Sequence, residues 1–110
     1  MSLYSQYIKE HRNDECIESD KGFCTYRYLN EHQVYIVDIF VLPEHRKSKE
    51  ASNLADLVVK AAKDRGCKQL FGTVVPGTNN ATASLKVLLG YGMELDSIRD
   101  NMIVFKKEII

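Results

Sequence analysis

The feature that most constrains this chain is a nearly continuous run of apolar and β-branched residues, VYIVDIFVL, at Val34–Leu42. Such a run predicts a central strand of a sheet that is covered on both faces. Pro43 ends the strand, because a proline cannot donate a hydrogen bond to the ladder. Asp38 interrupts the run, and a carboxylate inside an apolar strand is costly unless it is paired or reaches water. The segment therefore predicts a central strand, and Asp38 is a candidate functional residue within it.

The rest of the chain alternates helical and strand patterns, without a repeat, linker or low-complexity tract. Apolar residues recur at i, i+3, i+4 and i+7 from Leu54, and Gly66 follows as a C-cap, which predicts the longest helix. In chain order we expect a helix over 2–12, strands at 15–18, 22–29 and 34–42, a helix over 51–65, a strand at 68–75, a helix over 80–89, and strands at 93–99 and 102–107. The order α-β-β-β-α-β-α-β-β predicts an α/β (α+β) fold class with a mixed sheet.

Length and charge limit the classes of protein to consider. A chain of 110 residues supports one core, so we expect a single domain over residues 1–110. Lys and Arg together number 15, as do Asp and Glu, which gives no electrostatic reason to expect a nucleic-acid or acidic-membrane surface. No apolar run approaches the roughly 18 residues of a membrane helix, and the N-terminus has no secretory apolar stretch. We therefore expect a cytoplasmic protein with neither a nucleic-acid nor a membrane partner.

Cysteine and histidine usage gives no sign of a metal. Cys16, Cys24 and Cys67 are odd in number and form no C-x-x-C pair, and the three histidines are scattered. Neither a disulfide framework nor a zinc site is suggested. Cys24 and Cys67 lie in or beside predicted strands, where small core residues are common.

The loop between the central strand and the long helix, PEHRKSKEAS, is basic, with Arg46, Lys47 and Lys49. The first turn of a helix leaves backbone N–H groups unpaired, and the macrodipole places partial positive charge there. A phosphate or pyrophosphate is the natural ligand of such an arrangement. From charge alone, a solvated basic loop is an equal alternative.

Two segments of the chain together resemble the GNAT superfamily of N-acetyltransferases. The stretch V-L-P-E-H-R before a helix is similar to that family's acetyl-CoA-binding motif, whose loop reads R/Q-x-x-G-x-G/A; here it reads R-K-S-K-E-A. The family's second element, one strand later, is matched here by Asn79, Thr82, Leu85, Gly90 and Tyr91. The resemblance covers roughly residues 22–107 and implies a GNAT-like acyl-CoA N-acyltransferase fold.

The resemblance implies acetyl-CoA as cosubstrate. The pantetheine arm would lie between the central strand and the strand after the long helix, hydrogen-bonded to the backbone of Ile39, Phe40 and Val41. The pyrophosphate would lie on backbone N–H groups of Arg46, Lys47, Ser48, Lys49, Glu50, Ala51 and Ser52. Asn79 would line the far side of the cofactor. An acceptor amine, on a small molecule or on a protein, would attack the thioester directly in a ternary complex.

Two residues are predicted to act in the transfer step. Alternation places Asp38 on the same face as Ile36 and Phe40, where it would bind a cationic amine or remove its proton through a water. A structural ion pair or hydrogen bond is the alternative for Asp38. Lys86 stands where many family members carry a tyrosine that protonates the departing CoA thiolate, and its ammonium group would donate a proton or stabilise the thiolate. Tyr91 occupies what is usually an aromatic core position.

The chain departs from the family pattern in three places. Lys49 replaces the first glycine of the loop, Lys86 replaces the tyrosine, and about 13 residues precede the first strand, where family members have an additional strand and two helices. These departures leave a second interpretation open, a degenerate, non-catalytic GNAT-fold module that binds or inhibits a partner. The short front also predicts an acceptor pocket that is shallow or is completed by a second subunit, and exposed sheet edges favour a homodimer.

Overall fold

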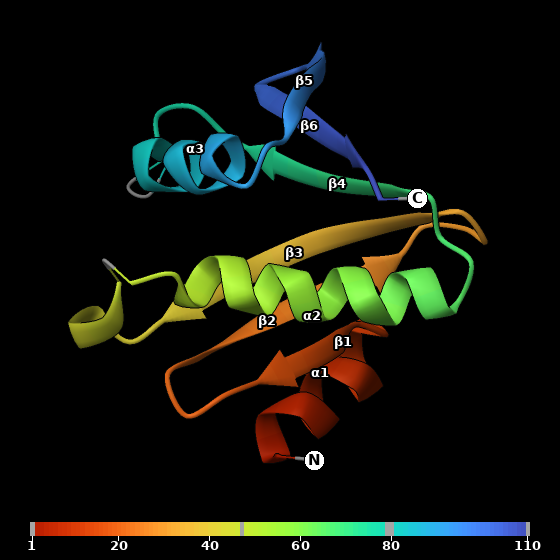
Figure 1. The fold of residues 1–110 in the computed structure, drawn as a ribbon, viewed down its shortest axis with the longest axis vertical. Helices are drawn as coiled ribbons and strands as arrows, with labels where there is room; N and C mark the ends of the chain where they lie inside the picture. Colours follow the sequence, from red (N-terminus) through yellow and green to blue (C-terminus); the bar gives the residue numbers. More distant parts are fainter. Residues whose placement is uncertain (1, 47, 79–80, 110) are drawn as a thin grey trace.

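The computed structural model describes residues 2–46, 48–78 and 81–109. Figure 1 shows the elements in chain order, which are α1 (Leu3–Arg12), β1 (Glu15–Glu18), β2 (Gly22–Tyr28), β3 (Gln33–Val41), the 3-10 turn η1 (Pro43–His45), α2 (Glu50–Asp64), β4 (Gln69–Val74), α3 (Ala81–Gly90), β5 (Glu94–Arg99) and β6 (Met102–Glu108). The predicted order and fold class are confirmed, and η1 is the one addition in the described part of the chain. No helix among the described residues is long and apolar enough to cross a membrane.

The strands form one six-stranded sheet in the order β1-β2-β3-β4-β6-β5. All neighbouring pairs are antiparallel except β3 and β4, which are parallel. α1 lies on one face of the sheet, and α2 and α3 pack on the other. The register places neighbours Phe23 and Cys24 of β2 on these two faces: Phe23 meets Tyr4 of α1, and Cys24 joins the core under α2.

The core fills the space between α2, α3 and the inner face of the sheet. Its largest fully buried apolar side chains are Leu54, Leu70, Val34 and Val58. Cys24 and Cys67 are buried within or beside this core, as expected, and Cys16 is partly exposed. Burial raises the pKa of the Cys24 thiol to about 12, so this side chain remains a neutral packing group at physiological pH.

A buried carboxylate holds α1 onto the sheet. Asp14, between α1 and β1, is 1% exposed, and its two oxygens accept hydrogen bonds from Nε of Arg27 at 2.6 Å and Nη2 of Arg27 at 3.2 Å. The same bond raises the pKa of Arg27. This bidentate arrangement is the strong form of an ion pair. It fixes the end of α1 against β2, and so places α1 relative to the sheet.

A β-bulge divides β3. In the ladder with β2, Tyr26 is opposite Ile36 and Thr25 is opposite Asp38, which leaves Val37 as the extra residue. Residues directly opposite each other share a face of the sheet, so the bulge reverses the alternation along the second half of β3.

The bulge overturns one prediction and limits another. Asp38 shares a face with Phe40, as predicted, but the expectation that Ile36 lies on that face was wrong, because one inserted residue separates them. Asp38 is exposed and Phe40 is 40% exposed, both on the α1 side of the sheet. The strand is therefore central, but its second half is not covered on both faces.

Gly22 permits a close approach of β2 to the end of β3. A Cβ atom at this position would lie 2.1 Å from the carbonyl oxygen of Phe40 and 2.9 Å from Cα of Val41. Both atoms belong to the backbone, so neither can rotate away. The position therefore requires glycine for reasons of space.

We predict that Gly22→Ala lowers the free energy of unfolding by about 2–3 kcal/mol, because the new methyl group forces β2 away from β3. The measurement is equilibrium denaturation in urea. Gly90→Ala is the matched control: Gly90 ends α3 and has no heavy atom of the described residues within 4 Å of its Cβ position. This control is expected to be neutral or slightly stabilising. Equal stability of the Gly22 variant and the parent would contradict the close approach.

Candidate functional site

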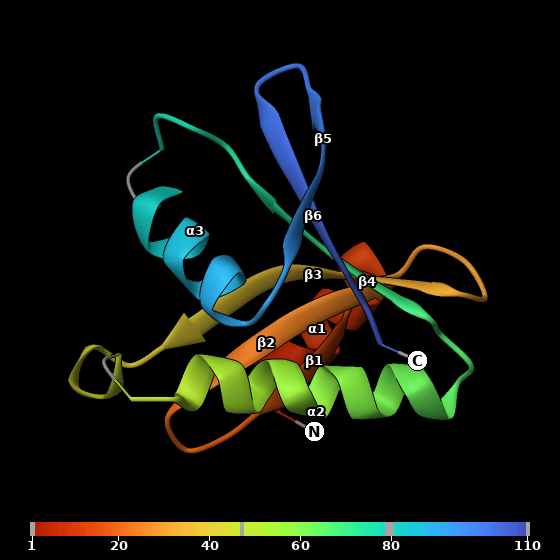
Figure 2. The same ribbon diagram turned by 45° about the horizontal axis from the view of Figure 1, so that its top comes forward.

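The central feature of the site is the fork between β3 and β4. The two strands pair over three residue pairs, from Gln33–Gln69 to Tyr35–Phe71. Beyond Tyr35 they diverge, as Figures 1 and 2 show. Near the start of the fork, the hydroxyls of Tyr35 and Thr73 lie 2.8 Å apart and form a hydrogen bond across it. The second half of β3 thus presents to the fork a backbone edge that has no ladder partner in β4.

The fork encloses a cavity of about 470 Å³. Six of the predicted site residues line it, namely Asp38, Ile39, Phe40, Val41, Arg46 and Ala51. The opposite wall is formed by the second half of β4, including Gly72 and Thr73, and by Val87 and Leu88 of α3. These lining residues come from both faces of the sheet, so the cavity passes between the strands.

The loop before α2 contributes to one end of the cavity. Ser48 accepts a hydrogen bond on Oγ from the N–H of Glu50 at 3.3 Å and donates one to the carbonyl oxygen of His45. Glu50 accepts on its carboxylate from Ser19 Oγ in the β1–β2 turn, at 3.4 Å. Ser48, Lys49, Glu50 and Ser52 are not among the described residues that line the cavity, and Lys47 lies outside the described residues.

Lys49 stands at the N-cap of α2 with φ −87° and makes no side-chain capping bond. This conformation is open to any L-residue, so the backbone there does not depend on the freedom of a glycine. The first N–H groups of α2 have no partner within the helix, and the exposed ammonium group of Lys49 adds positive charge beside them.

Arg46 joins this loop to the end of β3. Its Nε donates to the carbonyl oxygen of Val41 at 2.9 Å, and its guanidinium carbon lies 5.5 Å from the centre of the Phe40 ring. A full positive charge therefore lies at the α2 end of the cavity, next to the apolar side chain of Phe40.

Lys86 lies on the exposed side of α3 and is not one of the described residues that line the cavity. Its role beside the departing thiolate stays a prediction. The same holds for Asn79, which lies outside the described residues.

Tyr91 packs against the core, as expected from its position in the motif. Its hydroxyl donates to Oδ1 of Asp56 on α2 at 2.6 Å, and Lys107 Nζ lies 4.4 Å from its ring centre. Burial and the bond to Asp56 raise the pKa of Tyr91. The hydroxyl is thus engaged in holding α3 to α2.

Sequence reasoning placed the cofactor between β3 and β4 but named no residue of the β4 wall of the cavity. Thr73 is the one hydroxyl residue of the segment KQLFGTVV, and Gly72 beside it faces Leu88 of α3 closely enough that a Cβ would lie 3.0 Å from Leu88 Cδ2. A polar residue next to a glycine within an apolar strand was the available signal, since glycine in a strand often marks a close approach.

The sequence matches the model of the acetyltransferase (GNAT) family over residues 8–91. The chain therefore belongs to the GNAT acetyltransferase family. No curated protein sequence matches it. In the described residues there is no group of three or more His, Cys, Asp or Glu residues that could hold a metal ion.

Solved structures share the fold. A GNAT-family acetyltransferase from Elizabethkingia anophelis with acetyl-CoA bound superposes with a TM-score of 0.72 at 17% identity, over 94% of this chain and 82% of that one. An acetyltransferase from Bacillus subtilis in complex with CoA gives a TM-score of 0.72 at 16% identity, over 96% and 84%. A Desulfovibrio desulfuricans protein assigned to the GNAT acetyltransferases gives 0.78 at 17%, over 96% and 76%. At these identities the likeness concerns the fold.

Proposed function

We propose that this chain transfers an acetyl group from acetyl-CoA to a primary amine by direct attack within a ternary complex. The observation that carries the proposal is the cavity between β3 and β4, which is lined by Ala51 and Arg46 near the start of α2 and by the carboxylate-bearing Asp38. An extended cofactor arm and an amine would therefore meet within one space.

The cavity suits the cofactor chemically. A pyrophosphate at the start of α2 would receive the first N–H groups of the helix and the positive charges of Arg46 and Lys49. The amide groups of the pantetheine arm need hydrogen-bond partners. The edge of β3 that faces the fork offers the backbone N–H and C=O groups of Ile39 and the N–H of Val41, while the Val41 carbonyl oxygen already accepts from Arg46. Val74 and Leu88 provide an apolar wall opposite.

Acetyl-CoA and the amine would bind from opposite faces of the sheet. The start of α2 lies on one face, and the Asp38 side chain projects from the other. The amine nitrogen would attack the thioester carbonyl carbon, so that a C–N bond forms and the C–S bond breaks. Before the attack, Asp38 would bind the ammonium group and, through a water, take one of its protons, which leaves the neutral amine as the nucleophile. The nitrogen loses a second proton to solvent as the amide forms. The leaving CoA thiolate takes up a proton, for which we propose Lys86 or the solvent as the source.

A non-catalytic GNAT-fold module that binds or inhibits a partner is the second candidate. The described lining residues include no Tyr, Cys, His or Lys that would protonate the thiolate, and the Tyr91 hydroxyl is bonded to Asp56. Binding of the cofactor without turnover of any amine would favour this candidate.

We predict that acetyl-CoA binds the purified protein with a dissociation constant in the micromolar range, measured by calorimetric titration with CoA and desulfo-CoA as controls. Arg46→Gln is expected to weaken binding about 5–10-fold, because a charged hydrogen-bond donor is lost near the pyrophosphate. Arg65→Gln, at the other end of α2, removes the same charge and should leave the affinity unchanged. Release of CoA thiol in the presence of amines then measures turnover. Absence of binding at millimolar acetyl-CoA would overturn the proposal.

We predict that Lys49→Gly does not strengthen acetyl-CoA binding, since the backbone at Lys49 already has a conformation that any residue adopts. The affinity should stay the same or fall up to about threefold through loss of one exposed charge. Lys49→Ala is the matched control, because it removes the charge without adding the backbone flexibility of a glycine. A tenfold gain in affinity for the glycine variant would contradict this interpretation, because it would mean that the lysine side chain crowds the pyrophosphate.

We propose that copies of the chain pair through β5. This strand forms one edge of the sheet, and Leu95 and Ile98 on it are 59% and 67% exposed. An unpaired edge with apolar side chains is a template for pairing with another chain. Light scattering should give the mass of a dimer, and Ile98→Lys should give a monomer. A monomeric mass for the parent at high concentration would contradict the pairing.

A further inference from the structure

Three aromatic side chains form a continuous row on the α1 face, beside Asp38. The ring centres of Tyr4 and Phe23 are 4.9 Å apart, and those of Phe23 and Phe40 are 5.5 Å apart. Phe40 follows Asp38 by two residues on the same face of β3, and both line the cavity. The row therefore starts on α1, crosses β2 and ends at the cavity, next to a carboxylate.

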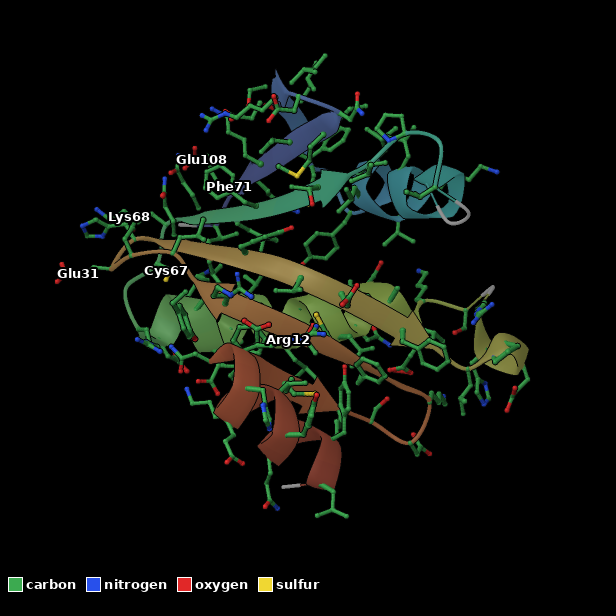
Figure 3. The ribbon with its side chains drawn as sticks, turned by 180° about the vertical axis from the view of Figure 1, so that it is seen from behind. Arg12, Glu31, Cys67, Lys68, Phe71 and Glu108 are labelled. Atoms are coloured by element: carbon green, nitrogen blue, oxygen red, sulfur yellow. The ribbon has the colours of Figure 1, made fainter. Side chains whose placement is uncertain are left out.

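The row is accessible from solvent. Tyr4 and Phe40 are 42% and 40% exposed, although both lie against Phe23. Figure 3 views the sheet from this side and shows α1 over the first strands, with β3 and β4 not covered by a described helix on this face. Burial, and after it the charge of Asp38, raises the pKa of the Tyr4 hydroxyl, which is consistent with the carboxylate lying within electrostatic reach of the row.

The charges around the row favour a ligand with a single positive charge. Asp38 is the one carboxylate among the described lining residues, and Arg46 places a cation 5.5 Å from the Phe40 ring centre. A second ammonium group at the Phe40 end would be repelled by Arg46. Two further carboxylates lie near the Tyr4 end of the row, and both have partners. Glu18, two strands away from Phe40, accepts a hydrogen bond from Ser2 Oγ at 2.7 Å, and Asp14, whose charge also raises the pKa of Tyr4, is bonded to Arg27.

We propose that the acceptor is a primary monoamine that carries an aromatic group, with its ammonium group at Asp38 and its ring on the row formed by Phe40, Phe23 and Tyr4. The inference rests on the proposed acetyl transfer. In that reaction the ammonium nitrogen loses two protons, one through a water to Asp38 and one to solvent, and gains the acetyl group. CoA leaves as the thiol, so the ring is unchanged and serves only in recognition. Aromatic pairs prefer offset or tilted contacts at the centre distances already present in this row.

The test compares 2-phenylethylamine with putrescine as acceptors at saturating acetyl-CoA, with released CoA thiol as the readout. We expect kcat/KM for 2-phenylethylamine to exceed that for putrescine at least tenfold. Phe40→Leu should lower the ratio of kcat/KM for 2-phenylethylamine to that for putrescine about fivefold, whereas Phe40→Tyr, which keeps the ring, should retain the ratio. The ratio of the two amines cancels any general damage to the enzyme.

Two further variants separate recognition from folding. Tyr4→Leu removes the other exposed ring of the row, which lies on α1 instead of β3, and should also lower the ratio of kcat/KM for 2-phenylethylamine to that for putrescine. This variant tests the proposal if Phe40→Leu does not fold. Tyr7→Leu is the matched control, because Tyr7 is 52% exposed on α1 but stacks on His11 instead of on the row. This control should leave the ratio unchanged.

The possible failures are distinguishable. Turnover with a preference for putrescine, or an equal loss for both amines in Phe40→Leu and Tyr4→Leu, would overturn the aromatic acceptor and leave acetyl transfer intact. Binding of acetyl-CoA with no turnover of either amine, or of a broader amine panel, would overturn both proposals.

Discussion

The site depends on the short parallel pairing of β3 with β4. A parallel ladder normally continues along both strands, but here it ends at Tyr35 and Phe71, and the bulge at Val37 bends β3 soon after. Each lost ladder bond leaves backbone groups that need other partners. On the β3 side of the opening, the strand is held by the core under α2 and by the close contact of Gly22 with the end of β3. The edge of β3 that faces the fork thus remains available to a ligand.

One buried polar side chain beside the bulge lacks a hydrogen-bond partner among the described residues. The Thr25 side chain is 3% exposed, and its hydroxyl has no hydrogen-bond partner in the described part of the chain. Thr25 lies directly opposite Asp38 in the ladder, and Asp38 faces solvent at the cavity. Local imperfections of this kind are expected where a structure serves function. By contrast, both carboxylate oxygens of Asp14, on the same face, accept hydrogen bonds from Arg27, and this pair holds α1 in place.

The sequence predicts the elements of the site better than their orientation. The apolar run of β3, the basic loop and the apolar period of α2 each have a local physical cause, so their order and approximate limits were predictable. The face of Asp38 was not, because nothing in VYIVDIFVL marks the bulge at Val37, and one extra residue reverses the alternation. The row of Tyr4, Phe23 and Phe40 joins residues far apart in the chain, so only the strand register and the placement of α1 bring them together.

The width of the fork is set by a few contacts that span it. Tyr35 bonds to Thr73 from strand to strand, and Tyr91 bonds to Asp56 from the end of α3 to α2. Lys107 of β6 donates to the carbonyl oxygen of Tyr91 at 2.8 Å, so the end of α3 is also bonded to β6. These bonds link the two halves of the sheet and so fix the spacing of the cavity walls. A preformed cavity lowers the conformational cost of binding, so its lining residues can act directly on affinity and on the choice of acceptor.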